Sequence, residues 1–212
     1  MRVELFACPG SGNCFKAWLA IQKLQIPHKL SVVDVLNGEQ KSAEFLTKNP
    51  DGVVPFLVTS SGDSFGESNA MLWFLSEGSY LMPQSREARA KALQWMFFEQ
   101  TKLEPFISPA RFLTTIAPHL GKGRGDEIDE MIKRALPGLA RLDDHLSRNR
   151  FILGDGFSLA DISVFGYTHV ADDAGISLSQ FKSIERWINR VQETERFESM
   201  DGMSGSLLAL AA

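Results

Sequence analysis

The spacing of apolar and polar residues predicts a mixed α/β arrangement in the first third of the chain. Short runs of apolar residues predict strands, whereas apolar positions three or four residues apart predict helices. We expect strands at residues 3–7, at 29–33 and after Pro55, the last followed by a hairpin turn at residues 60–63. We expect helices at residues 13–24, around 41–46 and at 68–75. The elements therefore follow the order βαβ and then ββα.

The pattern changes after Gly78, because almost everything beyond it has a helical period. The stretch SEGSYLMPQSRE is polar and contains Gly and Pro, which is typical of a connector. Helices are expected over residues 88–112, 126–146, 159–171 and 181–194. We therefore predict an α/β domain over residues 1–78, a linker over 79–86 and an all-helical domain over 87–212.

Composition and charge restrict the class of protein. The 212 residues are 44% hydrophobic, enough for one sizeable core or two small ones. The net charge of −4, with no basic cluster interleaved with aromatic residues, argues against a nucleic-acid partner. No apolar run approaches the ~20 residues that cross a bilayer, so no membrane role is expected. The N-terminus MRVELFACPG lacks the features of a signal peptide, which favours a soluble, cytoplasmic protein.

Two cysteines lie six positions apart near the N-terminus, at Cys8 and Cys14. No second cysteine pair and no nearby histidine accompany them. Neither a disulfide framework nor a metal site is therefore expected.

The stretch NPDGVVPFLV, residues 49–58, places a proline where a strand begins. Proline has no backbone N–H to give to a sheet, so Pro55 is expected at a strand's first residue, at an edge or in a turn. The backbone of its neighbours is then exposed. By itself, the segment is also typical of a loop that merely joins a helix to a strand.

The stretch GESNAML follows the predicted hairpin and begins a helix with Glu67 and Ser68. A helix N-terminus attracts a carboxylate, to which the Ser68 hydroxyl can add a hydrogen bond, and Glu67 can pair with an ammonium group. This combination suits an α-amino acid. The alternative is that Ser68 only caps its own helix. Further along, Ser158 and Asp161 have the spacing of a capping box, for which we expect a structural role.

Three stretches in this order, FLTKNPDGVVPFLV, FGESNAMLWFL and FILGDGFSLADISVFGY, resemble the cytosolic glutathione S-transferase family. They resemble its cis-proline loop, its site for the γ-glutamyl group of glutathione and the capping box of its second domain. The resemblance spans nearly the whole chain and favours the bacterial zeta-, theta- or nu-like members. It implies a thioredoxin-like first domain, an all-helical second domain and glutathione as co-substrate.

The resemblance also implies roles for individual residues in glutathione binding. The bond between Val54 and Pro55 is expected to be cis, with the Val54 backbone pairing with the backbone of glutathione. Lys41 is the candidate partner for the glycine carboxylate of glutathione, although a lysine in a polar turn is usually just solvated. Members of the family usually form homodimers, so a homodimer is expected here.

The segment CPGSGNC must supply the group that activates the sulfur, because a thiol of pKa ~8.5 is mostly protonated at neutral pH. Aligning Lys16 with the basic residue common in zeta-like and bacterial classes places Ser11 where those classes carry an active Ser or Thr. Asn13 then matches a second amide donor found in some bacterial members. The alternatives are that Ser11 and Asn13 only form a loop and helix cap, or that Cys14 forms a mixed disulfide with glutathione as in the omega and beta classes.

The helical domain is expected to hold the second substrate, with Arg111 and Phe112 as candidate contacts if the helix bends at Pro105 and Pro109. The leading hypothesis is a detoxifying glutathione transferase that conjugates the thiolate to a small electrophile. The alternatives are a glutathione-dependent isomerase or thiol reductase, and a non-catalytic glutathione-binding scaffold.

Overall fold

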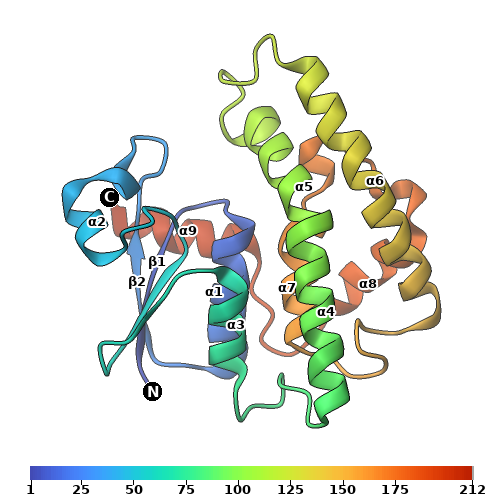
Figure 1. Cartoon of the computed structure of the whole chain (residues 1–212), viewed down its shortest axis with the longest axis horizontal. Coiled ribbons are helices and arrows are strands. Elements are labelled where there is room, and N and C mark those ends of the chain that lie inside the picture. Colours follow the sequence, from blue (N-terminus) through green and yellow to red (C-terminus); the bar gives the residue numbers. More distant parts are fainter. Residues whose placement is uncertain (212) are drawn as a thin grey trace. The chain divides into compact units, whose positions relative to one another are not determined.

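The computed structural model describes residues 1–211 and divides into two compact units, both drawn in Figure 1. The first unit comprises Met1–Ser79 together with the C-terminal segment that begins at Glu195. The second unit is Tyr80–Thr194. The fold is that expected from the sequence, a mixed sheet with helices in the N-terminal unit and helices in the second.

The first unit is built on a four-stranded sheet with the order β2-β1-β3-β4. Its strands are β1 (Val3–Ala7), β2 (His28–Val32), β3 (Phe56–Thr59) and β4 (Ser64–Phe65). Strand β1 runs parallel to β2 and antiparallel to β3, which is antiparallel to β4. The parallel pair requires a crossover helix and the β3–β4 pair only a short turn, as the βαβ and ββ order of the sequence predicts.

The helices of this unit are α1 (Gly12–Leu24), the 3₁₀ turn η1 (Glu39–Lys41), α2 (Ala43–Lys48) and α3 (Ser68–Ser76). Figure 1 shows α1 and α3 on one side of the sheet and α2 on the other. Side chains alternate across a strand, so Leu5 is buried on one face of β1 while Phe6 packs on the other with Phe45 and Phe56. The sheet therefore has an apolar core on each side.

The second unit consists of helices. They are α4 (Arg86–Lys102), α5 (Glu104–Arg111), the π-helical turn η2 (Phe112–Ile116), α6 (Gly125–Arg148), α7 (Leu159–Thr168), the 3₁₀ turns η3 (Asp172–Ala174) and η4 (Leu178–Gln180), and α8 (Lys182–Gln192). All ten residues of α7 are buried, which makes it the central helix of the unit.

One predicted helix, residues 88–112, is two helices in the structure, with the break at Leu103. Pro105 has no N–H to donate to the carbonyl of Thr101, so the helical ladder is interrupted there. A new helix begins at Glu104 with the proline in its first turn, where the missing N–H costs nothing.

The predicted capping box at Ser158 and Asp161 is present, and Asp161 also joins three segments of the second unit. Its fully buried carboxylate accepts hydrogen bonds from the Ser158 N–H and hydroxyl, both at 3.0 Å. It also accepts from the Ile152 N–H at 2.8 Å and from the Trp187 indole at 2.9 Å. Burial raises the pKa of this carboxyl to about 6. The structural role expected for this motif is confirmed.

The C-terminal segment differs from the expectation that residues 87–212 form one domain, because it belongs to the first unit. Helix α9 (Met200–Ala211) packs on α1 and β2 and buries Met203 and Leu207. The Lys23 ammonium donates to the Glu195 carbonyl at 2.9 Å, and the Gly10 N–H donates to the Ser204 hydroxyl at 3.0 Å. Only contacts between distant parts of the chain define this arrangement, so no local pattern predicts it. Within the described residues, no helix has the length and apolar character needed to cross a membrane.

Candidate functional site

Ser11 lies at the N-cap of α1, in the loop that leaves β1. Its hydroxyl oxygen accepts the Cys14 N–H at 3.2 Å, which satisfies one amide of the first helical turn. Hydrogen bonding by the same hydroxyl favours lower pKa values for the Cys8 and Cys14 thiols. Ser11 therefore acts as a helix cap, as one interpretation of the sequence predicts, and its hydroxyl favours the thiolate form of two nearby cysteines.

The two cysteines near Ser11 form no disulfide, and the pKa values of their thiols are shifted in opposite directions. Burial and the neighbouring Cys8 raise the pKa of the Cys14 thiol well above its ordinary value. The hydrogen bond from Cys14 lowers the pKa of the Cys8 thiol, although burial opposes the shift. Cys14 is completely buried, so its thiol stays protonated. Cys14 is the reactive thiol in one alternative that the sequence leaves open, whereas the structure makes Cys8 the more acidic of the pair.

Asn13 connects the start of α1 to the start of α3. Its side-chain oxygen accepts the Ser68 hydroxyl at 3.1 Å and the Lys16 ammonium at 3.0 Å. Ser68 and Lys16 are both buried, while Asn13 is partly exposed. The structure therefore joins a residue predicted to lie near the sulfur of glutathione to one predicted to bind its γ-glutamyl group. In this arrangement the proton of the Ser68 hydroxyl is already donated to Asn13.

The loop before β3 presents unpaired backbone. The Val54–Pro55 peptide bond is cis, and among residues 1–211 the Val54 N–H and C=O have no hydrogen-bond partner. The loop is tied in place by the Asn49 amide, which donates to the Val53 carbonyl at 2.8 Å. Lys41 donates to the Asp51 carbonyl at 3.1 Å. The predicted residues Lys41, Val54 and Pro55 thus belong to one loop and its neighbouring turn.

Glu67 has a backbone conformation that the sequence does not reveal. Its φ of 59° is in the left-handed region, which is uncommon for a residue other than glycine. The side chain is exposed and makes no capping hydrogen bond to α3. The N–H groups in the first turn of α3, including that of Ser68, have no acceptor within the helix. The Glu67 carboxylate, the N-terminus of α3 and, through Ser68, the Asn13 side chain therefore lie in one part of the first unit.

The two residues expected to contact a second substrate lie in the second unit. Arg111 ends α5 and is buried, and its guanidinium pairs with Asp173 at 3.0 Å. Phe112 begins the π-helical turn and is partly exposed. An ion pair at the surface is the alternative to a substrate contact for this arginine, and the structure holds it in an ion pair that is buried within the helical unit.

Two family models match the chain on either side of the linker. The model described as "Glutathione S-transferase, N-terminal domain" matches residues 10–77, and "Glutathione S-transferase, C-terminal domain" matches residues 125–190. A solved glutathione S-transferase from Pseudomonas fluorescens Pf-5 is 38% identical with a TM-score of 0.89, over 93% of this chain and 98% of that one. The chain belongs to the glutathione S-transferase family.

Two further relatives are also similar to the chain. Glutathione S-transferase 3 of Zea mays is 30% identical over 168 residues, 75% of this chain and 73% of that protein. The disulfide-bond oxidoreductase YfcG of Escherichia coli is 26% identical over 202 residues, 90% of each.

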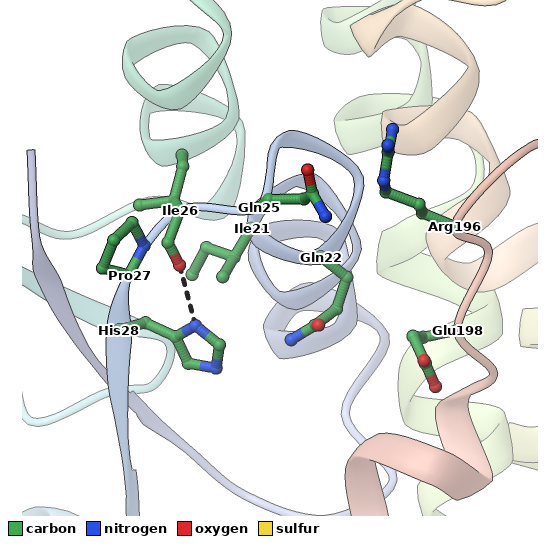
Figure 2. A pocket seen from close by; sticks show the side chains of 8 residues that line it. All are labelled: Ile21, Gln22, Gln25, Ile26, Pro27, His28, Arg196 and Glu198. Atoms are coloured by element: carbon green, nitrogen blue, oxygen red, sulfur yellow. Dashed lines mark hydrogen bonds between the residues drawn. The ribbon is translucent and has the colours of Figure 1, made fainter.

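One pocket of this glutathione S-transferase family member lies elsewhere on the first unit, at the C-terminal end of α1 (Figure 2). It has a volume of about 530 Å³ and is lined by Ile21, Gln22, Gln25, Ile26, Pro27, His28, Arg196 and Glu198. His28 Nδ1 lies 2.9 Å from the Ile26 carbonyl, as the dashed line in Figure 2 shows. None of the residues predicted to bind glutathione lines this pocket. Within the described residues, no group of three or more His, Cys, Asp or Glu side chains is placed to hold a metal ion.

Sequence reasoning missed Lys16 as a member of the site and used it only for alignment. One feature of the sequence could have indicated this contact. Asn13 lies three residues before Lys16 in a mostly apolar helix, and residues i and i+3 share a helix face. That spacing alone does not reveal that the lysine is fully buried.

Proposed function

We propose that this family member is a glutathione transferase. It binds reduced glutathione on the first unit, keeps its sulfur as a thiolate beside Ser11 and adds that sulfur to a small electrophile. The observation that carries the proposal is the polar cluster around Asn13, which connects the start of α1 to the start of α3. A ligand with a thiol near one end of this cluster and an amino-acid group near the other matches glutathione.

Each polar part of glutathione has a candidate partner in the first unit. The γ-glutamyl carboxylate meets the N-terminus of α3, and the ammonium pairs with the exposed Glu67 carboxylate. The central peptide pairs with the unpartnered Val54 backbone, in the loop shaped by Pro55, much as an added strand does. The glycine carboxylate pairs with Lys41, whose ammonium is held near the same loop by the Asp51 carbonyl.

Ser11 and Asn13 provide donors for the thiolate. Lowering the pKa of a thiol by two units requires about 2.7 kcal/mol of preferential stabilisation of the anion. A hydroxyl donor, an amide donor and the N-terminus of α1 together supply energies of this size. The hydroxyl of Ser11 already favours a lower pKa of the Cys8 thiol, and in the proposed complex it donates to the sulfur of glutathione.

The electrophile meets Arg111 and Phe112 of the second unit in this proposal. The Asp173 pair holds Arg111 through its Nε–H, and in the proposal the positive charge of the guanidinium attracts a polarised substrate. Substrates that carry an anionic or electron-withdrawing group are therefore expected to have the lower KM. An Arg111→Met enzyme that keeps the wild-type KM for such substrates would contradict this assignment.

Homodimer formation is part of the proposal and has support on α4. Leu93 and Phe97 lie one turn apart on this helix and are 37% and 67% exposed. An exposed pair of large apolar side chains on one helix face is typical of an interaction surface. Light scattering is expected to give twice the mass of the 23.5 kDa chain, and a monomeric mass would refute the dimer.

A cytoplasmic role in detoxification completes the proposal. Reduced glutathione and free protein thiols are found together in reducing compartments, and both cysteines of this chain are free. Recovery of the native protein in an oxidising compartment after cell fractionation would contradict this location.

The test of the main proposal is the Ser11→Ala variant. Isothermal titration calorimetry is expected to detect binding of reduced glutathione by the wild type and by the variant. With a chloro-aromatic electrophile, kcat/KM is expected to fall about 10- to 100-fold in the variant, because one donor to the thiolate is lost. Ser85→Ala is a matched control, since Ser85 caps α4 in the same way at 3.1 Å. Absence of glutathione binding by the wild type would overturn the proposal.

A second candidate function, thiol–disulfide exchange with glutathione, is favoured by the Cys8 and Cys14 pair. The Cys8 thiolate attacks a disulfide, keeps one half as a mixed disulfide and releases the other as a thiol. The glutathione thiolate then attacks this mixed disulfide and frees Cys8. Reduction of a small disulfide that is abolished by Cys8→Ser, but is unchanged in Ser11→Ala, would favour this function over transfer. The similarity to YfcG is consistent with it.

A further inference from the structure

Lys16 is an ammonium group with no exposed surface beside the candidate site. Taking an ammonium out of water is unfavourable unless hydrogen bonds offset the lost hydration. One of these hydrogen bonds goes to the Asn13 side-chain oxygen at 3.0 Å. This charge is therefore held against a residue proposed to contact the substrate.

The Lys16 contact determines how the Asn13 amide is oriented. Its oxygen receives two donors, the Lys16 ammonium and the Ser68 hydroxyl at 3.1 Å. The reversed amide would place its NH₂ against an ammonium that cannot accept, so only one orientation satisfies both neighbours. The amide nitrogen is then directed away from Lys16 and Ser68.

The charge also changes the strength of the Asn13 amide as a donor. A cation bonded to the amide oxygen draws electron density from the nitrogen, which makes its N–H groups more acidic and stronger donors. This polarisation is large where water is excluded, and both Lys16 and Ser68 are buried.

We propose that Lys16 is a positioning residue for thiolate formation, which acts through Asn13. It orients the Asn13 amide and polarises it, so that the amide nitrogen stabilises the thiolate of bound glutathione. The inference rests on the proposed function, because it assigns how the same site activates glutathione. Lys16 never touches the substrate in this proposal. As a buried cation, it nevertheless belongs to the groups that control the pKa of the thiol.

Another lysine of α1 provides a matched comparison. Lys23 is also buried, at 1% exposure, and its ammonium donates to a backbone carbonyl, that of Glu195, at 2.9 Å. Replacing Lys16 or Lys23 by Met removes the same charge from the same helix. Only the Lys16 change removes a contact with Asn13.

The test measures the pKa of the thiol in the glutathione complex, from the ultraviolet absorbance of the thiolate as a function of pH. Lys16→Met is expected to raise this pKa by about one unit. At pH values below the pKa, kcat/KM is then expected to fall about tenfold, because the thiolate fraction falls by that factor. Lys23→Met is expected to leave the pKa unchanged. Lys16→Gln keeps a neutral donor to Asn13, and is expected to fold and to give an intermediate pKa. A purely structural role for Lys16 would lower the melting temperature without moving the pKa.

A double-mutant cycle tests whether the effect passes through Asn13. In an Asn13→Ala background, Lys16→Met is expected to cause no further rise in the pKa of the thiol. An additive rise would show that Lys16 does not act through Asn13. The wild type is expected to lower the pKa of the glutathione thiol. If the folded Lys16→Gln variant lowers this pKa equally, the inference about Lys16 is wrong, whereas the proposed function stands. If the wild type does not bind glutathione, both are wrong.

Discussion

Buried polar side chains hold together parts of this protein that are distant in sequence. Asp161 accepts four hydrogen bonds from the Ser158, Ile152 and Trp187 segments of the second unit. In the first unit, the buried Lys16 and Ser68 both donate to the partly exposed Asn13. A buried polar group is stable only because its partners are present, so removing one partner leaves that group less well satisfied.

At the residue scale, Asp161→Asn is expected to lower the free energy of unfolding by about 1–3 kcal/mol near neutral pH. The substitution turns one acceptor atom into an NH₂ group that faces existing donors. Urea unfolding followed by circular dichroism measures the change. Asp144→Asn, which removes an exposed carboxylate paired with Arg148, is the control and is expected to have little effect.

The loss in Asp161→Asn is expected to depend on pH in a defined direction. The carboxyl has a pKa of about 6 when folded, against 3.8 ordinarily, so the folded chain binds this proton more tightly than the unfolded chain. The contribution of Asp161 to stability is therefore complete below pH 3.8 and falls as the pH rises through about 6. The difference between wild type and variant should shrink over that window. A difference that grows with pH would contradict the raised pKa.

At the scale of elements, the loop between α2 and β3 depends on Gly52. Its φ of 58° is left-handed, and an added Cβ would lie 2.8 Å from the Gln40 carbonyl and 2.9 Å from the Lys41 ammonium. The backbone of this loop therefore cannot accept a side chain without moving. The carbonyl of Asp51, next to Gly52, accepts a hydrogen bond from Lys41, and Val54 lies two residues after Gly52. A shift of the backbone at Gly52 therefore alters the proposed glutathione contacts.

Gly52→Ala is expected to reduce glutathione affinity about tenfold or more and to destabilise the protein by about 1–3 kcal/mol. Calorimetric titration gives the affinity and denaturant unfolding gives the stability. Gly62→Ala is a matched control, since Gly62 also has positive φ, at 93°, but nothing lies within 4 Å of an added Cβ. Unchanged affinity in Gly52→Ala would show that this loop does not bind glutathione.

At the scale of the whole molecule, the chain leaves the first unit at Ser79 and returns to it at Glu195. Helix α9 covers part of α1 and β2 and buries Met200, Met203 and Leu207. The first unit is therefore completed by residues that are the last along the chain. Its stability should therefore depend on the C-terminal segment.

Removing residues 195–212 is expected to cost the first unit several kcal/mol, since each buried Met or Leu contributes about 1.5–3 kcal/mol. Hydrogen exchange measured by mass spectrometry should accelerate in α1 and β2, with little change in α6. The control removes only residues from 208 onward, which keeps Leu207 and leaves out the exposed Leu208 and Leu210. Equal exchange in the full-length and shortened proteins would show that α9 does not stabilise the first unit.

Much of the fold could be predicted because it depends on local patterns. The strand expected at residues 3–7 is β1, and the helices expected at 13–24 and 68–75 correspond to α1 and α3 within one residue at each end. The period of apolar residues, together with Ser caps and Gly turns, specifies which backbone conformation buries each segment. The capping box at Ser158 is likewise a property of four consecutive residues.

Motifs and their order were also sufficient for the family, and they named Ser11, Asn13, Val54, Glu67 and Ser68 as candidates. Only the tertiary structure decided how these residues are connected. It placed Lys16 and Ser68 on the same Asn13 oxygen, buried Arg111 against Asp173, made Cys8 more acidic than Cys14 and brought α9 back to the first unit. The physical reason is that a local pattern reports the conformation and the buried face of its own segment. Hydrogen bonding, burial of charge and pKa depend on groups that the fold brings from distant parts of the chain.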